Sequence, residues 1–136
     1  MKYFDRDGKH NFVDVNNVFV GYDSGQSCCE DADWVIRSKI AVSSEDFIDD
    51  TGKTNRTDDL LIDEYNLEDY NFDTSFFKQI DSTDFSSLYD GGVAIFRMVN
   101  SKGEELFLHL YNIHNGYYGH GFDMTADGET LFEGCL

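Results

Sequence analysis

Two histidines and two tyrosines near the end of the chain are the residues best spaced to do chemistry together. Asn115-Gly116 is typical of a two-residue hairpin turn, and a type I′ turn there places Tyr111 opposite His120. His109 is then diagonal to His120, about 7–8 Å away at the backbone. Such a pair of imidazoles can hold a metal ion or act as a base with its partner. The candidate ligand site therefore consists of His109, Tyr111, Tyr118 and His120.

The same aromatic face has a simpler interpretation. The acidic middle of the chain can fold over it, and the ring nitrogens can find partners nearby. We favour this interpretation, because two histidines without an evident third ligand are a weak metal signal. Cys29 and Asp123 are conceivable further ligands, but we assign neither a metal nor a cofactor.

The adjacent cysteines Cys28 and Cys29, followed by Glu30, also have two interpretations. A thiolate there can be a nucleophile or a soft metal ligand. A reduced cysteine is otherwise a small buried hydrophobe. We favour the second, because no Lys or Arg within six positions lowers the thiol pKa. With Cys135 the chain has three cysteines, which fits no complete disulfide framework and favours reduced thiols in a bacterial-type cytoplasm.

Charge is the strongest signal in the composition. The segment 43–90 holds fourteen Asp/Glu and three Lys/Arg, a net −11 within a chain of net −17. A field of this sign repels nucleic acid, anionic membranes and nucleotide-like substrates, and it attracts basic surfaces. The expected partner is therefore a basic protein surface, and direct binding to nucleic acid or to a membrane is not expected.

A rigid array of carboxylates can occupy a groove that normally grips DNA. The leading hypothesis is a non-enzymatic inhibitor that mimics nucleic acid and blocks a DNA-handling or defence protein. Its partner-binding residues are predicted to be Asp49, Asp50, Asp58, Asp59, Asp63, Glu64, Glu68 and Asp69. The alternatives are that the charge only keeps a small domain soluble, or that the aromatic and histidine face binds a small ligand or metal. Catalysis is not favoured, because no nucleophile elbow, phosphate-cradling loop or His-rich metal motif is present.

The elements that position these residues are predicted mostly as strands. FVDVNNVFVGY, from Phe12, favours a strand or a hairpin around Asn16-Asn17, and the segment from Trp34 fits a strand or a short helix. Ser43 and Thr57 are candidate helix starts. Further on, four segments read as an antiparallel meander with turns at 100–103, 115–116 and 126–128: VAIFRMV, ELFLHLYNIH, YYGHGFDM and ETLFEGCL. Leu106, Leu108 and Leu110 form its apolar face.

We therefore expect one α+β domain over residues 1–136, with 43–90 as an acidic insert or flap. It combines an antiparallel meander of about four to six strands with one or two short helices from the acidic segment. The first ten residues lack the apolar stretch of a signal peptide, and no apolar run is long enough to cross a membrane. A cytoplasmic protein is expected.

Two short blocks together resemble a known group. The first is Cys28-Cys29-Glu30, and the second is the hairpin Asn115-Gly116-Tyr117-Tyr118. Their order, with an acid-rich middle between them, resembles a family of small uncharacterised bacterial and phage proteins. The resemblance implies a small α+β domain acting in the cytoplasm of a bacterial host. It implies no particular chemistry.

Overall fold

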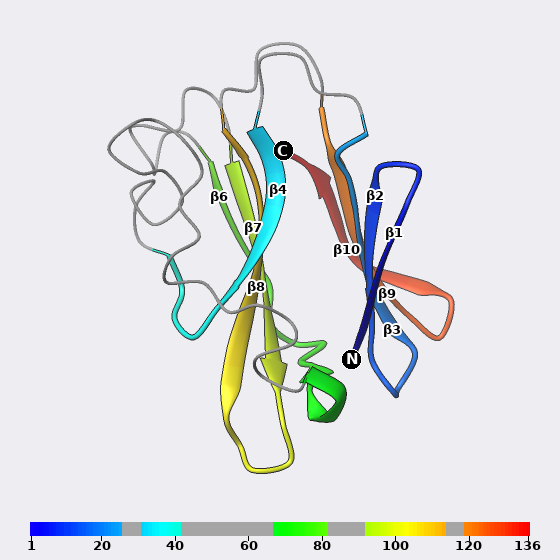
Figure 1. The fold of residues 1–136 in the computed structure, drawn as a ribbon, viewed down its shortest axis with the longest axis vertical. Coiled ribbons are helices and arrows are strands. Elements are labelled where there is room, and N and C mark those ends of the chain that lie inside the picture. The colour runs from blue at the N-terminus through cyan, green and yellow to red at the C-terminus, as the bar shows by residue number, and fades with distance from the viewer. Residues whose placement is uncertain (26–30, 42–66, 82–91, 114–118) are drawn as a thin grey trace.

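The computed structural model describes residues 1–25, 31–41, 67–81, 92–113 and 119–136. Within these ranges the chain forms ten β-strands and one short 3-10 turn. The strands build two antiparallel sheets that pack face to face (Figure 1). Along β3 the alternate residues Val18, Val20 and Tyr22 are buried, which is typical of a strand that has one face in a core.

Sheet A has the strand order β1-β2-β3-β9-β10. Its strands are β1 (Lys2–Arg6), β2 (Lys9–Val13), β3 (Val18–Asp23), β9 (Gly121–Ala126) and β10 (Glu129–Cys135). Tight turns connect β1 to β2, β2 to β3, and β9 to β10. The predicted hairpin around Asn16-Asn17 is confirmed, with Asn17 at φ 60°. The predicted turn at 126–128 is confirmed as well, with Asp127 and Gly128 at φ 52° and 81°.

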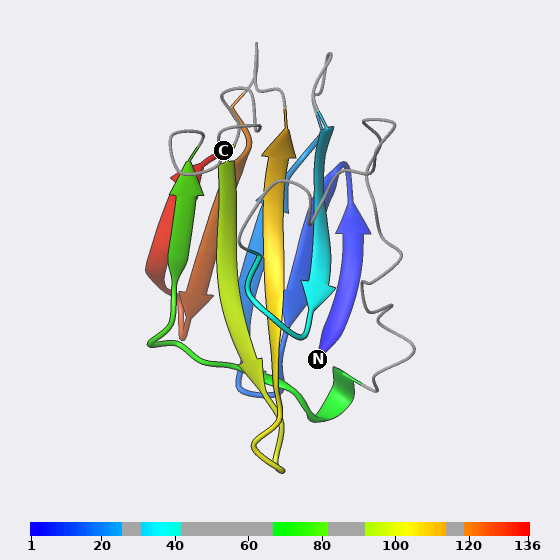
Figure 2. The same ribbon diagram turned by 90° about the vertical axis from the view of Figure 1, so that its left-hand side faces the viewer.

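Sheet B has the order β4-β8-β7-β5, and β6 also pairs with β7. Its strands are β4 (Asp31–Arg37), β5 (Asn71–Phe72), β6 (Lys78–Asp81), β7 (Gly92–Val99) and β8 (Glu105–Ile113). The predicted hairpin of β7 and β8 is confirmed, and the segment containing Trp34 is a strand. Figure 2 looks onto this sheet, with sheet A behind it.

The main core lies between the sheets. Val20, Tyr22, Phe122 and Met124 from sheet A belong to one buried cluster with side chains of sheet B. The predicted apolar face of Leu106, Leu108 and Leu110 is confirmed, since all three belong to this cluster. The 3-10 turn η3 (Leu67–Asp69) closes one end with Leu67, which is buried beside Met1 in the same cluster.

The predicted α+β class is wrong, because the described residues form two antiparallel sheets and contain no α-helix. The candidate helix starts at Ser43 and Thr57 lie outside the described residues. The described end of the acidic segment forms η3, β5 and β6 instead. These strands pair with the edge of β7 that does not contact β8, and the pairing buries Phe72 and Ile80. None of the described residues forms a helix that could cross a membrane.

The predicted four-strand meander is also wrong, because its second and third strands, β8 and β9, do not pair with each other. Strand β8 pairs with β4 and β7, whereas β9 pairs with β3 and β10. Both edges of each strand are therefore occupied, and β8 and β9 lie in different sheets. The physical reason is that each strand has an apolar face, and two such faces bury more surface across a sandwich than side by side. The predicted turn at Asn115-Gly116 lies outside the described residues.

Candidate functional site

His109 lies on the outer face of sheet B and is fully buried. Its Nε2 atom lies 3.1 Å from the backbone N of Ala41, and its Nδ1 atom lies 3.1 Å from the carbonyl oxygen of Phe107. A backbone N–H only donates, so Nε2 accepts and Nδ1–H donates to the carbonyl. The ring is a neutral imidazole, and both of its nitrogens are engaged by the backbone. Tyr111, on the same face, is buried in an apolar cluster with Val35 and Ile95.

His120 lies on the other sheet, just before β9, and is 2 % exposed. Its Nδ1 atom lies 3.0 Å from the carbonyl oxygen of Asp23, and its ring packs against Tyr22 with centroids 6.3 Å apart. Because β8 and β9 are not paired, the structure does not bring His109 and His120 together on one hairpin face. Tyr118 lies outside the described residues. Among those described, no cluster of His, Cys, Asp and Glu is suited to hold a metal ion.

Two of the eight predicted partner-binding acids are described, and both are exposed. Glu68 and Asp69 form the exposed part of η3, whose Leu67 is anchored in the core. The Oδ2 atom of Asp69 accepts a hydrogen bond of 2.7 Å from the Ser101 hydroxyl in the β7–β8 turn. Exposed Glu104 follows in that turn. The other six acids, Asp49, Asp50, Asp58, Asp59, Asp63 and Glu64, lie outside the described residues, as do Cys28, Cys29, Glu30, Asn115, Gly116 and Tyr117.

Asp73 and Arg97 extend this acidic end of the sandwich. The Ser75 side chain and backbone N–H donate to Asp73, and together with Arg97 they lower the pKa of its carboxyl below 3.8. Arg97 is held between two acids, at 2.9 Å from Asp73 and 2.7 Å from Glu105. The hydrogen bonds that Arg97 donates to Glu105 and to Asp73 raise the pKa of its guanidinium, with Glu105 the larger cause. The arrangement fixes carboxylates in position, since each has a donor that orients it.

The lowered pKa of Asp73 predicts a pH-dependent contribution to stability. Its carboxylate stabilises the fold above the unfolded pKa of 3.8, and the contribution is lost as the pH falls through the lower folded value. Replacing Asp73 with Asn should lower the urea midpoint at neutral pH and cost less as the pH falls below 3.8. Ser75→Ala should show a weaker form of the same dependence. An Asp73→Asn penalty that is equal in acid and at neutral pH would contradict this assignment.

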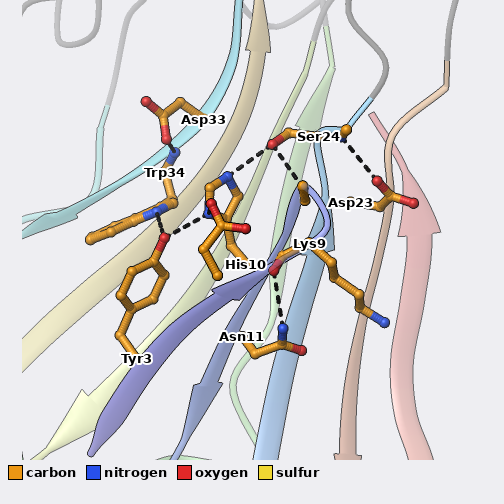
Figure 3. A network of polar contacts seen from close by, with 11 residues as sticks. Tyr3, Lys9, His10, Asn11, Asp23, Ser24, Asp33 and Trp34 are labelled. Carbon is orange, nitrogen blue, oxygen red and sulfur yellow. Dashed lines mark hydrogen bonds and ion pairs between the residues drawn. The ribbon is translucent and has the colours of Figure 1, made fainter.

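Sequence reasoning missed a network that joins the first strands to β4 (Figure 3). Tyr3 Oη lies 2.8 Å from Nδ1 of His10, and Nε2 of His10 lies 2.8 Å from the Ser24 hydroxyl. Trp34 Nε1 donates to Tyr3 Oη over 3.4 Å, and Ser24 donates to the carbonyl of Gly8 over 3.3 Å. Fourteen positions separate His10 from Ser24, so no local pattern signals the contact.

A serine beside a histidine is the arrangement of an activated nucleophile. The direction of the donors here argues otherwise. Because Ser24 donates its hydroxyl proton to the carbonyl of Gly8, its oxygen accepts from Nε2–H of His10. Nδ1 of His10 then accepts from the Tyr3 hydroxyl. The imidazole donates to the hydroxyl instead of accepting its proton, as a base would. The network therefore connects the two sheets and does not define a catalytic dyad.

A second missed residue is Asp14, a carboxylate that is only 5 % exposed. Its Oδ1 atom accepts hydrogen bonds from the backbone N–H groups of Asn16 and Val18, and its Oδ2 atom accepts one from Phe72. Asp14 thus closes the β2–β3 turn of sheet A and links it to β5 of sheet B. An Asp two residues before an Asn in a hairpin turn is a recognisable signal for the local part of this contact.

The outer faces of the two sheets differ. The outer face of sheet B is a second apolar core that contains Val35, Ile95 and Phe107. The outer face of sheet A carries large apolar side chains that remain exposed, with Phe4 at 44 % and Phe19 at 40 %. This face is the more accessible apolar surface among the described residues.

Fold and surface together define an antiparallel two-sheet β-sandwich with an excess of acidic side chains. No family model matches the chain, and neither a curated protein nor a solved structure matches it significantly. The resemblance based on Cys28-Cys29-Glu30 and the Asn115-Gly116 hairpin therefore stays a prediction.

Proposed function

We propose that this protein acts by binding a basic protein surface, without catalysis. The observation that carries the proposal is the placement of Glu68 and Asp69. Both are exposed on a turn whose flanking residues, Leu67 and Tyr70, are buried in the core. Carboxylates held in this way bind a basic partner with little loss of side-chain freedom, which favours charge complementarity over nonspecific attraction.

The acidic surface does not end at η3. Asp69 is hydrogen-bonded to Ser101 in the β7–β8 turn, and exposed Glu104 and Glu105 follow that turn. Among the described residues, the cations near this charge are Lys102, Arg97, the Met1 ammonium, which donates to the carbonyl of Leu67, and Lys2, which lines a depression with Glu68. Arg97 is already engaged by Asp73 and Glu105. The remaining predicted acids belong to the same segment of the sequence and lie outside the described residues.

The form of this function that we propose is competition with nucleic acid. A DNA-binding protein presents Lys and Arg side chains spaced for phosphates. Carboxylates on a folded domain can bind these side chains in place of the phosphates. The partner would be a DNA-handling or defence protein of a bacterial host. The protein would act in the cytoplasm of that host as a phage or prophage product.

A capture experiment tests the proposal. Immobilised protein, exposed to bacterial lysate, should retain a DNA-binding protein that is released by salt and by added duplex DNA. Glu68→Gln with Asp69→Asn should weaken binding of that partner about fivefold, as expected for the loss of two exposed ion pairs. Changing all eight predicted acids to amides should abolish capture.

The matched control is Asp127→Asn with Glu129→Gln, which removes the same charge from the exposed β9–β10 turn on the other sheet. It should leave capture unchanged. Equal weakening by both double variants would show that only net charge matters. Salt-insensitive capture, or none, would refute the acidic binding surface.

A further inference from the structure

The outer face of sheet A, turned away from sheet B in Figure 1, differs in its charges from the acidic end at η3. Buried Phe12, Val20 and Phe122 point into the core, so the residues alternating with them point outward. The charged outward residues are Lys2, Arg6, Lys9, Asp23, Asp123 and Glu133. Three cations and three anions make the face neutral in a chain of net −17. A surface that served only solubility would be expected to carry the same acidic excess as the rest of the sequence, and not three cations on one face.

These charges are separated across the sheet. All three cations lie on β1 and β2, and all three anions lie on β3, β9 and β10. Apolar side chains occupy the space between them. These are Phe19 on the central strand and Val13 opposite it on β2, whereas Phe4 lies on β1 beside the cations. The face therefore has a basic side, formed by Lys2 and Arg6, and an acidic side, toward which the Lys9 side chain extends across Gly21.

The acidic side is hollow. A depression of about 570 Å³ lies over β9 and β10 and is lined by Gly121, Gly134, Asp123, Glu133 and Lys9, among others. Glycine replaces an outward side chain at Gly121, where a Cβ atom would come no closer than 4.0 Å to its nearest neighbour, the carbonyl oxygen of Gly134. At Gly21, on β3, the Lys9 side chain fills the corresponding space. On β1, by contrast, Phe4 and Arg6 are both exposed and stand at the other end of the same face. The face thus has a projecting side and a recessed side of opposite charge.

We propose that this face binds a second copy of the same chain. The strand order β1-β2-β3-β9-β10 has β3 at its centre. A two-fold axis alongside β3 and parallel to the strands brings β1 of one copy over β10 of the other, and β2 over β9. Phe4 and Arg6 of each copy then face the acidic hollow of the partner, and the two Phe19 rings meet near the axis. This association is independent of the proposed acidic binding function.

The available area is sufficient for a reversible dimer. Five strands about 4.8 Å apart and about 17–20 Å long bury on the order of 1,000 Å² in total when two such faces pack, at the lower limit for specific interfaces. Two sheets that pack with aligned strands are also the ordinary geometry of sandwich cores. A heterologous partner would not account for both charge signs on one face as simply as a two-fold contact does.

Sedimentation velocity of the whole chain tests the proposal, from about 1 to about 200 µM, where a contact of this size should associate. The wild-type protein should reach the mass of a dimer within this range. Phe19→Asp should weaken the dimer at least about 100-fold, because the axis loses two central aromatic residues at once. Val15→Asp is the matched control, since Val15 is 74 % exposed in the β2–β3 turn and off the face. It should dimerise like wild type.

Charge-reversal variants test the proposed two-fold contact between Arg6 and Glu133 even if Phe19→Asp destabilises the fold. Arg6→Glu and Glu133→Arg should each weaken self-association, because each places like charges across the contact twice. Their equimolar mixture should restore a one-to-one dimer. Wild-type protein that stays monomeric over the whole range, or a mixture that behaves as its separate components do, would overturn the proposal.

Discussion

Replacing Asp14 with Ala is expected to lower the free energy of unfolding by about 3–6 kcal/mol, since it removes two buried hydrogen bonds to a charged group, each contributing roughly 1.5–3 kcal/mol. Three backbone N–H groups lose their acceptor together, those of Asn16, Val18 and Phe72. Two of these bonds are buried, so water does not easily replace the carboxylate. Urea unfolding at neutral pH measures the loss.

Asp14→Asn separates the two halves of this contact. The amide oxygen can still accept from Asn16 and Val18, but the amide nitrogen then faces the N–H of Phe72, and two donors cannot bond. The β2–β3 turn should survive while its link to β5 is lost, at about half the cost of the Ala variant. Amide exchange should accelerate at Phe72 first. Equal losses for Asn and Ala, with no preference for Phe72, would contradict this division.

Most of the hairpins could be predicted from the sequence because turn chemistry is local. Asp127-Gly128 and Asn17 adopt the positive φ values that their residue types favour, and the strands on each side follow from them. The Leu106–Leu110 face was also predictable, because alternation with period two identifies a buried strand face without knowledge of its partner. These signals require no information about which strands meet across the core.

The partner of each strand was not predictable in the same way. A turn signal at Asn115-Gly116 favours pairing of β8 with β9, yet β4 and β7 occupy both edges of β8. Strand β4 is far from β8 in sequence. A local sequence pattern therefore cannot show that β4 competes with β9 for pairing with β8. The error in fold class has a similar origin. A helix-capping pattern indicates only that a helix can begin at that residue. The described end of the acidic segment instead forms β5 and β6, which pair with the edge of β7 that β8 leaves unpaired.

The histidine site failed to form for a related reason. Its geometry depended on the pairing of β8 with β9, and without it His109 and His120 lie on separate sheets. Each imidazole instead bonds to a nearby backbone group, Ala41 and Phe107 for His109 and Asp23 for His120. The ring nitrogens thus find local partners, as the simpler interpretation predicts, while most of the acidic segment that this interpretation folds over the face lies outside the described residues. Six of the eight predicted partner-binding acids lie outside the described residues. Their role in binding is therefore tested by the capture experiments.

Gly8→Ala is the second substitution with a large expected effect. Gly8 has φ 81° in the β1–β2 turn, and a Cβ atom built there would lie 2.5 Å from the Cα of Gly25. The left-handed conformation costs a residue with a Cβ about 1–2 kcal/mol. The overlap is with backbone and not with a flexible side chain, so relief requires movement of the chain near Ser24. Overpacking of this kind adds about 1–3 kcal/mol, for an expected total of about 2–5 kcal/mol.

Gly128→Ala supplies the matched control. Gly128 occupies the same position of an equivalent Asp-Gly turn, also at φ 81°, but a Cβ there would meet no atom within 4 Å. Only the conformational cost of about 1–2 kcal/mol should remain. The difference between the two unfolding free energies therefore isolates the close approach of Gly8 to Gly25. Because Gly8 also accepts hydrogen bonds from the backbone N–H and hydroxyl of Ser24, a shift there should disturb the contact of Ser24 with His10. Equal penalties at the two glycines would show that Gly25 yields freely and that this end of sheet A is not tightly packed.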